Sequence, residues 1–256
     1  MSKDLNEIAK IVDDAARTAT AIPQLSETGH DLTLEEAYQV QALSLARRYA
    51  RGEHQVGVKM GFTSEAKMKQ MGLKEMIWGR LTNVMLVDNG GEIDLKHYVH
   101  PRVEPEICFR LRAPLAGEVS PEEALAAVDA VAPALEIIDS RYENFKFNLP
   151  DVVADNTSTS SYVVGDWYPA DTDIADLAMA ISFDGEEVQS GSTSAILGDP
   201  LRALIGAARL VGKDGGRLEA GWHVMAGGAT AAEALTPGIS VRLDTENMTP
   251  VTFNVK

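Results

Sequence analysis

The hydrophobic pattern of the sequence changes once, close to Gly52, and this change limits the folds that the chain can adopt. Before Gly52, apolar residues recur every three or four positions, which is the spacing of amphipathic helices. A first helix is predicted to close at Pro23. A second begins at Thr33, where Glu36 completes a capping box. The apolar stripes contain Leu5, Ile8, Val12, Ala15 and Ala19 in the first helix, and Leu34, Ala37, Val40, Gln41 and Leu45 in the second.

After Gly52 the pattern favours short strands. Strands are predicted over 56–62, 83–87, 103–111, 134–138, 160–164, 177–183, 186–192, 223–225, 239–243 and 251–255. Three helices are predicted between them: from Ser64 to about Met71, from Ser120 to about Val131 before Pro133, and from the Asp199 cap to a point before Gly212. We therefore expect an α+β protein with a small N-terminal helical lobe, residues 1–54, on a β-rich body, residues 55–256, the two forming one functional unit.

The composition excludes several classes of function. The 256 residues carry 38 acidic and 23 basic side chains, which gives a net charge of −15. Most of such a surface repels nucleic acid and anionic lipid, so neither is an expected partner. No apolar run approaches the ~20 residues that span a bilayer, and the charged N-terminus lacks the apolar core of a signal peptide. The single cysteine, Cys108, permits no intrachain disulfide and is expected to be a buried thiol, which favours a cytoplasmic location.

Two glutamates in the segment HPRVEPEICF (100–109) give the strongest chemical signal. Residues two apart on a strand point to the same face, so Glu104 and Glu106 should project side by side. A third carboxylate, Glu136, interrupts an apolar stretch. Burying such groups is costly unless protons or a cation neutralise them. Carboxylate oxygens suit a hard divalent cation, and three of them leave positions open for a bidentate ligand such as a 2-oxo acid.

A structural interpretation of these carboxylates stays open at this point. Glu-x-Glu pairs are common on solvated strands. Glu136 could also be the neutralised partner of Arg102 or Arg141.

Lys59 is a further candidate, because it lies between Gly57 and Gly61, and glycines inside a strand often mark a close approach to the backbone. A buried lysine there could supply a positive charge or a proton, whereas a lysine on an edge strand would discourage aggregation. The stretch AGGAT (226–230) is either a plain turn or a set of backbone NH groups around an anion.

Five segments in a fixed order carry a resemblance to a known family. They are GVKMGFTS (57–64), MIWGRLTNVM (76–85), HPRVEPEICF (100–109), PALEIIDSRYENFKF (133–147) and DVVADNTSTS (151–160). Together they resemble the fumarylacetoacetate hydrolase superfamily. Within it they are similar to the branch of meta-cleavage pathway enzymes, which degrade aromatic compounds and comprise 4-oxalocrotonate decarboxylases and 2-hydroxypenta-2,4-dienoate hydratases.

The resemblance implies a mixed β-roll or barrel-like body that binds Mg²⁺ or Mn²⁺ through three glutamates, which match Glu104, Glu106 and Glu136 here. The active-site lysine of the family matches Lys59. Substrate-binding positions are carried over to Ser160 or Ser161 and to Thr230. Asp139 and Arg141 are further candidates for contact with the substrate, although each could instead be structural.

One departure from the family pattern helps to choose between the two branches. The hydratases carry an aspartate before an aromatic-glycine pair, and Ile77 occupies that position here. Hydration needs a group that activates water, and an isoleucine cannot do this. Loss of CO2 needs no water, and a drier pocket favours it. The resemblance therefore implies metal-dependent decarboxylation of 2-oxo-3-hexenedioate to 2-hydroxypenta-2,4-dienoate and CO2.

Other interpretations remain at this stage. The chain could be the hydratase, a hydrolase of acylpyruvate carbon–carbon bonds, or a non-catalytic partner of the hydratase. The last would have no need for three mutually repelling carboxylates. The resemblance also implies a homo-oligomer that can form a complex with the hydratase. It leaves open the step that Lys59 carries.

Overall fold

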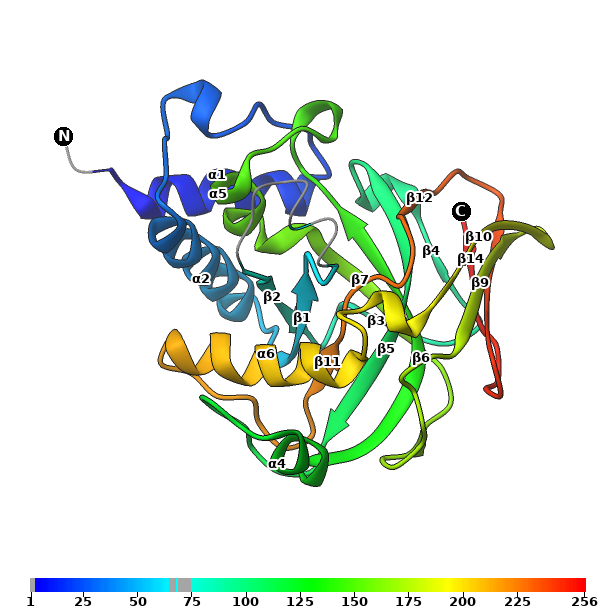
Figure 1. The fold of residues 1–256 in the computed structure, drawn as a ribbon. Coiled ribbons are helices and arrows are strands. Elements are labelled where there is room, and N and C mark those ends of the chain that lie inside the picture. Colours follow the sequence, from blue (N-terminus) through cyan, green and yellow to red (C-terminus); the bar gives the residue numbers. More distant parts are fainter. Residues whose placement is uncertain (1–2, 65–67, 69–74) are drawn as a thin grey trace.

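The computed structural model describes residues 3–64, 68 and 75–256, and Figure 1 shows helices on one side of a β-rich body. The helices described are α1 (Leu5–Thr18), α2 (Leu34–Ala50), α4 (Pro121–Ala126), α5 (Leu149–Ala154) and α6 (Pro200–Lys213). The strands described are β1 (Gln55–Gly61), β2 (Ile77–Thr82), β3 (Leu86–Val87), β4 (Gly91–Ile93), β5 (Pro101–Leu111), β6 (Val128–Asp139), β7 (Thr159–Val164), β8 (Tyr168–Pro169), β9 (Ala178–Phe183), β10 (Glu186–Ser192), β11 (His223–Met225), β12 (Glu233–Ala234), β13 (Ser240–Thr245) and β14 (Val251–Val255). The expected α+β class is confirmed.

The first two helices are present, although α1 ends at Thr18, before Pro23, with Ala19 as a left-handed cap. Asp4 caps α1 by accepting hydrogen bonds from two backbone amides, and Thr33 and Glu36 form the predicted capping box of α2. Ile8 and Val12 of α1 pack with Ala37 and Val40 of α2 and against α5, whereas Leu34, predicted on the buried side of its helix, is 41% exposed. This core also takes in Ile77 and Tyr142 from the later part of the chain. The division at residue 54 stays a prediction.

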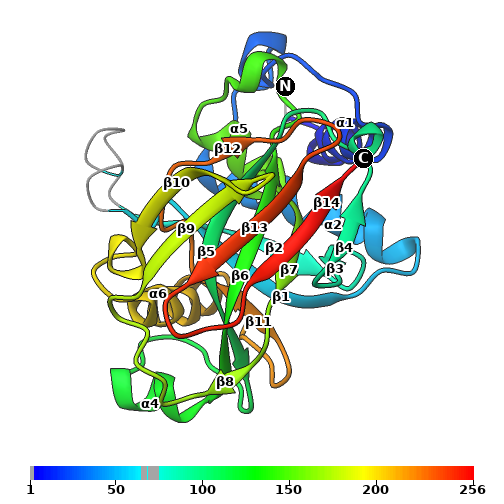
Figure 2. The ribbon, with the colours of Figure 1, turned by 90° about the vertical axis from the view of Figure 1, so that its right-hand side faces the viewer.

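Two sheets build the body. In the part of the chain that is described, the larger sheet has the order β2-β1-β11-β5-β6-β7-β3, with β12 beside β5 and β8 beside β6. The smaller sheet has the order β10-β9-β13-β14-β4. Figure 2 shows it lying across β5 and β6 of the larger sheet, in agreement with contacts between β13 and β6 and between β9 and β5. The main hydrophobic core fills the space between the sheets and under α6.

The central hairpin of β5 and β6 corrects one prediction. The Ser120 capping box is present, but α4 ends at Ala126 and strand β6 begins at Val128. Pro133 does not end a helix; it lies within β6, opposite Ile107 of β5. Eleven paired positions with β5 hold β6 in the extended state. This long-range pairing overrides the local helix signal.

Other elements also differ from their predicted bounds. Of the strand predicted over 83–87, only β3 is present. Strand β2 lies just before it, in a stretch for which the sequence predicts no strand because Gly79 interrupts the hydrophobic alternation. Helix α6 continues through Gly212, where a side chain would come within 2.4 Å of the backbone of Gly117. The helix predicted from Ser64 to about Met71 lies outside the described residues.

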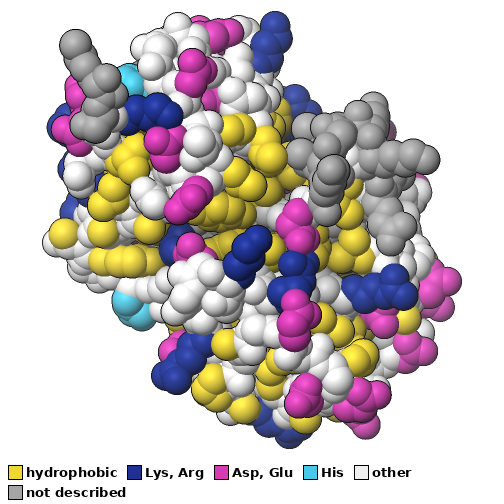
Figure 3. Space-filling view, turned by 60° about the vertical axis from the view of Figure 1, so that its left-hand side comes forward, with side chains coloured by type: hydrophobic (Ala, Val, Ile, Leu, Met, Phe, Trp, Pro, Cys, Tyr) yellow, Lys and Arg dark blue, Asp and Glu magenta, His cyan; other side chains and the backbone are white. Residues whose placement is uncertain are grey.

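Figure 3 shows the face on which α2 and α6 come forward, with a band of hydrophobic side chains between groups of acidic and basic ones. A groove of about 680 Å³ between these two helices is lined by Leu34, Tyr38, Trp78 and Leu210, among others. Among the helices that the structure describes, none has the length and apolarity needed to cross a membrane.

Candidate metal centre

Three carboxylates meet where β5 and β6 run side by side. Glu104 and Glu106 project from the same face of β5, as the two-residue period requires. The antiparallel register places Glu136 of β6 directly opposite Glu104. One oxygen from each carboxylate lies within 4.8 Å of the others, and Glu106 and Glu136 are fully buried. The sequence therefore identified a real cluster, although nothing local in it shows that Glu136 faces the pair.

Burial and mutual repulsion dominate the electrostatics of this cluster. Burial, followed by the charges of Glu136 and Glu104, raises the pKa of Glu106 well above its usual value, and Lys59 and a hydrogen bond from Gly227 oppose that rise. The Gly227 amide donates to Glu106 Oε2 at 2.8 Å. The stretch 226–230 thus turns a backbone NH toward an anion, and this anion is a side chain of the protein itself.

Gly228, the next residue, leaves no room for a side chain beside the carboxylate cluster. A Cβ atom at Gly228 would stand 2.9 Å from Glu104 Cδ, so a side chain there would displace Glu104. Gly227 has φ +105°, a conformation that L-residues rarely adopt, and a Cβ there would overlap Thr63. The loop after β11 therefore packs its backbone directly on two of the three carboxylates.

Lys59 faces the cluster from the neighbouring strand. Strand β1 lies between β2 and β11, so Lys59 is not on an edge strand, and its side chain is only 4% exposed. Its Nζ donates a hydrogen bond to Glu136 Oε2 at 3.2 Å and lies 3.1 Å from Oε1. The partner of Glu136 is therefore Lys59, and not Arg102 or Arg141 as the sequence also allowed.

The donor set fits a hard divalent cation. Within the described part of the chain, Oε1 of Glu106 and Oε1 of Glu136 are buried and accept no hydrogen bond. The Glu106 oxygen has no partner among the described residues, and the Glu136 oxygen has the Lys59 ammonium 3.1 Å away without a hydrogen bond. Such buried anionic oxygens are costly, and a cation would satisfy both. The one Lys59 ammonium does not balance ionised Glu106 and Glu136 together. Mg²⁺ and related ions bind carboxylate oxygens at about 2.0–2.6 Å, which the close approach of the three groups permits.

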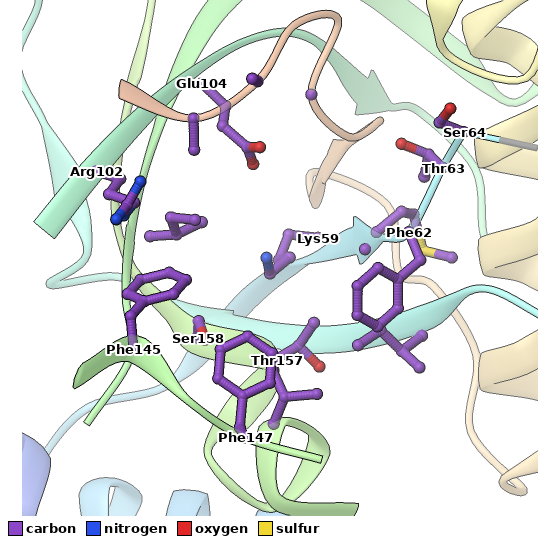
Figure 4. Close-up of a pocket in the computed structure, with 18 residues that line it drawn as sticks. Lys59, Phe62, Thr63, Ser64, Arg102, Glu104, Phe145, Phe147, Thr157 and Ser158 are labelled. Carbon is purple, nitrogen blue, oxygen red and sulfur yellow. The ribbon is translucent and has the colours of Figure 1, made fainter. Parts of the chain in front are cut away.

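A cavity of about 400 Å³ opens beside the cluster (Figure 4). Glu104 and Lys59 line it directly, while Glu106 and Glu136 lie behind its wall. Much of the remaining wall is apolar. It includes Phe62, Ile77, Ile138, Phe145, Phe147 and Val152. The buried cluster thus has an accessible side, on which a small organic acid could bind.

Strained backbone shapes this cavity. Phe62, Phe145, Thr157 and Ser158 line it, and all have φ near +56°, in the left-handed region. For a β-branched residue such as Thr157 this conformation is costly. It is held in place from β2, because Thr157 Oγ1 donates to the Trp78 carbonyl at 2.9 Å. Such strain is often found at functional sites.

Four of the other predicted residues are engaged with their own chain. Asp139 accepts hydrogen bonds from the Val99 and His100 amides. Arg141 is buried and binds Asp155 and the Thr159 carbonyl. Ser161 shares a hydrogen bond of 2.8 Å with Tyr98, and Thr230 donates to the Ala231 carbonyl. Neither these four nor Ser160 are among the wall residues described, and their contact with substrate stays a prediction.

Sequence reasoning missed several wall residues, above all Arg102 and Ser158. Arg102 carried a usable signal, because it lies two residues before Glu104 and therefore shares its strand face. Ser158 carried none, since its position depends on the left-handed turn over residues 156–158. Cys108 is buried as expected, and burial raises the pKa of its thiol.

Comparison with known proteins agrees with this geometry. Residues 47–256 match the family described as fumarylacetoacetate (FAA) hydrolase C-terminal. The chain is 57% identical to a 4-oxalocrotonate decarboxylase of a Pseudomonas species, over 98% of this chain and 97% of that protein. It is 35% identical to a 2-hydroxyhexa-2,4-dienoate hydratase of Comamonas testosteroni, over 84% and 83% of the two chains.

A solved structure gives the same result for the fold. The 4-oxalocrotonate decarboxylase from Pseudomonas putida G7, complexed with magnesium and adipate, superposes with a TM-score of 0.95 at 35% identity, covering 98% of this chain and 97% of the other. The family match extends over most of the chain and includes every residue of the carboxylate cluster. The chain therefore belongs to the fumarylacetoacetate hydrolase family.

Proposed function

We propose that this chain decarboxylates 2-oxo-3-hexenedioate to 2-hydroxypenta-2,4-dienoate and CO2, with Mg²⁺ as its cofactor. The observation that carries the proposal is the cluster of Glu104, Glu106 and Glu136 beside an apolar cavity. The decarboxylase relative at 57% identity, against 35% for a hydratase relative, supports this choice of reaction.

Glu104, Glu106 and Glu136 would hold the cation, whose charge, when it is bound, stabilises negative charge that develops on the 2-oxo oxygen of the substrate. The Gly227 amide donates a hydrogen bond to Glu106, and the Lys59 ammonium donates one to Glu136. These two hydrogen bonds orient two of the three carboxylates before substrate arrives. The magnesium-bound decarboxylase from Pseudomonas putida G7 supports the choice of metal.

Lys59 places a buried cationic group on the cavity wall next to Glu136. From there its ammonium can donate a hydrogen bond to an oxygen of a bound 2-oxo acid, and it offsets part of the negative charge that a dianion brings. Ile77 lines the same cavity and is 3% exposed. At this position it keeps water away from the reacting chain, which favours loss of CO2 over hydration.

The size of the cavity suits a small dicarboxylate. A volume of about 400 Å³ lies at the lower end of the range for ligand pockets. The bound adipate in the Pseudomonas putida G7 enzyme is a six-carbon dicarboxylate, the same chain length as the proposed substrate.

We further propose that the chain forms a homo-oligomer in the cytoplasm and associates with a hydratase that consumes its product. Hydratases of this kind are among its relatives, including a 2-hydroxypent-2,4-dienoate hydratase of Pseudomonas putida. Light scattering of the purified chain, alone and mixed with such a hydratase, would measure both associations.

Release of CO2 tests the proposed reaction directly. The purified protein should release one CO2 per 2-oxo-3-hexenedioate when Mg²⁺ is present, and chelation by EDTA should abolish this until Mg²⁺ is restored. Full activity after removal of divalent ions would contradict the metal dependence. Conversion of 2-hydroxypentadienoate to 4-hydroxy-2-oxovalerate, without CO2 release from the dioic acid, would show that the protein is a hydratase.

A further inference from the structure

Arg102 is a cationic residue of the cavity wall to which the mechanism gives no role. Figure 4 shows Arg102 and Glu104 projecting from the same strand into one cavity, with Phe145 beside Arg102. Its guanidinium carbon lies 4.6 Å from the centre of the Phe145 ring. Among the residues that the structure describes, no carboxylate forms an ion pair with it, and the only other cation on the wall is Lys59.

The two cations of the wall differ in availability. Lys59 is 4% exposed and is already engaged by Glu136. Arg102 is half-buried and is fixed by a ring face, which holds the guanidinium without using its N–H donors. A planar guanidinium on a partly apolar wall, with donors that no described residue is seen to engage, suits a carboxylate, which it can bind through two parallel hydrogen bonds.

Position along β5 indicates which carboxylate this is. Glu106, Glu104 and Arg102 follow one another on one strand face, and burial decreases from the fully buried Glu106 to the half-buried Glu104 and Arg102. Same-face positions are about 6.6–6.8 Å apart. A ligand held at the carboxylate cluster by one end therefore meets Arg102 about one such step further out. The two carboxylates of an extended six-carbon dioic acid are separated by a distance of the same order.

We propose that Arg102 binds the carboxylate of the substrate that lies far from the metal centre, and so selects 2-oxo dicarboxylates over 2-oxo monocarboxylates. The inference rests on the proposed function for the end of the substrate that the cluster holds. The bound carboxylate is the one that departs as CO2. An ion pair with it stabilises the ground state more than the transition state, so Arg102 contributes to KM and selectivity and not to kcat.

Two inhibitors that differ only in the distal carboxylate test this. Binding of 2-oxoadipate and of 2-oxohexanoate is measured by calorimetry in saturating Mg²⁺ for the wild-type protein, for Arg102→Gln and for Arg102→Lys. The Gln variant should weaken 2-oxoadipate binding by about tenfold to a hundredfold, while 2-oxohexanoate binding should stay within about twofold. The Lys variant should recover part of the lost affinity, because it keeps the positive charge but cannot form two parallel hydrogen bonds to the carboxylate.

Arg110→Gln is the matched control, because Arg110 lies on the same strand, also over an aromatic ring, 4.5 Å from the centre of Trp167, and outside the cavity wall as described. It should leave both affinities unchanged. In turnover, Arg102→Gln should raise KM with kcat kept or increased. Equal losses for the two inhibitors would place Arg102 at the 2-oxo acid end and overturn the proposal, and so would no loss for either.

The binding comparison does not depend on turnover. A wild-type protein that prefers 2-oxoadipate through Arg102 but releases no CO2 would contradict the decarboxylase function and leave the role of Arg102 standing. A wild-type protein that releases CO2 but shows no preference between the two inhibitors would support the decarboxylase function and contradict the role of Arg102.

Discussion

Glu106 is the residue at which folding and function conflict most directly. It is fully buried, faces two other carboxylates and has an oxygen without a hydrogen bond from any described residue. Without a cation, its ionised form destabilises the fold. With a cation, the same charge becomes a ligand. A neutral isostere should therefore separate the two effects.

Glu106→Gln should raise the melting temperature of the metal-free protein at neutral pH, because it removes repulsion from Glu104 and Glu136. It should also abolish the rise in melting temperature that Mg²⁺ gives the wild type, together with most CO2 release. Differential scanning calorimetry with and without Mg²⁺ measures these effects. Glu187→Gln, on the exposed strand β10, is the control and should change neither. A metal-free variant that melts below the wild type would contradict this account.

The pH dependence of the metal-free protein follows from the same residue. The pKa of Glu106 is raised in the folded state, so between the unfolded value, near 4.5, and the raised value the folded chain binds more protons. Stability must then fall as pH rises through that interval. Urea titrations of the metal-free protein from pH 4.5 upward should show this fall, and Glu106→Gln should flatten it. Stability that rises with pH equally in both proteins would contradict the prediction.

At the residue scale, the sequence predicts that two candidate ligands on the same strand lie together. It does not predict which residues of different strands face each other. The period of two brings Glu104 and Glu106 together from local sequence alone. That Glu136 stands opposite Glu104, and that Lys59 reaches Glu136, depends on the register of β6 and the placement of β1. Local sequence marked Glu136 and Lys59 as candidates, and the resemblance grouped them with Glu104 and Glu106, but neither gave the register that brings them together.

At the scale of elements, one buried amide ties three of them together. Gln41 of α2 is fully buried and donates to the carbonyls of Trp78 in β2 at 3.1 Å and Val153 in α5 at 3.0 Å. It also accepts a hydrogen bond from Arg80. The sequence pattern correctly predicts Gln41 on the buried face of its helix. It does not predict which carbonyls accept its hydrogen bonds.

Gln41→Leu should therefore lower the free energy of unfolding by about 2–3 kcal/mol, because it leaves buried polar partners without hydrogen bonds. Trp78 also carries the bond that holds the strained Thr157, so CO2 release should fall as well. Urea denaturation measures the first effect. Gln39→Leu makes the same change at an exposed position of α2 and should change stability by less than about 0.5 kcal/mol. Equal losses in both variants would contradict a role for the buried amide.

Local signals predicted elements best where pairing did not compete with them. The capping boxes at Thr33 and Ser120 are both present. The first begins a helix of 17 residues and the second a helix of only 6, because β6 then pairs with β5 along its length. The extent of an element was thus decided by its neighbours in space, which no local pattern contains.

At the scale of the whole molecule, the order of the larger sheet could not be predicted. Strand β1 pairs in parallel with β11, and Gly57 lies opposite His223, far along the chain. This pairing carries Lys59 toward the carboxylates and brings the loop after β11 onto Glu106. The α+β class follows from periodicity, whereas the site depends on a strand order that only long-range packing fixes.

The net charge of −15 has a kinetic consequence for a dianionic substrate. The protein as a whole repels such a substrate, and among the described residues of the cavity wall Lys59 and Arg102 are the cationic side chains that can attract it locally, together with a bound cation. Added salt screens the long-range repulsion more than the short contacts in the cavity. Between about 10 and 150 mM ionic strength the Debye length falls from about 30 to 8 Å, so kcat/KM for the dioic acid should rise, by roughly two- to fivefold.

Initial rates of CO2 release at several concentrations of an inert salt, each with saturating Mg²⁺, measure this dependence. Binding of 2-oxohexanoate, a monoanion, is the control and should respond about half as steeply, because repulsion scales with the ligand charge. A kcat/KM that falls as salt is added would contradict the prediction and show that the local positive groups dominate at long range. In that case the net negative charge of the protein would not slow substrate binding, and it could not be what limits kcat/KM at low salt.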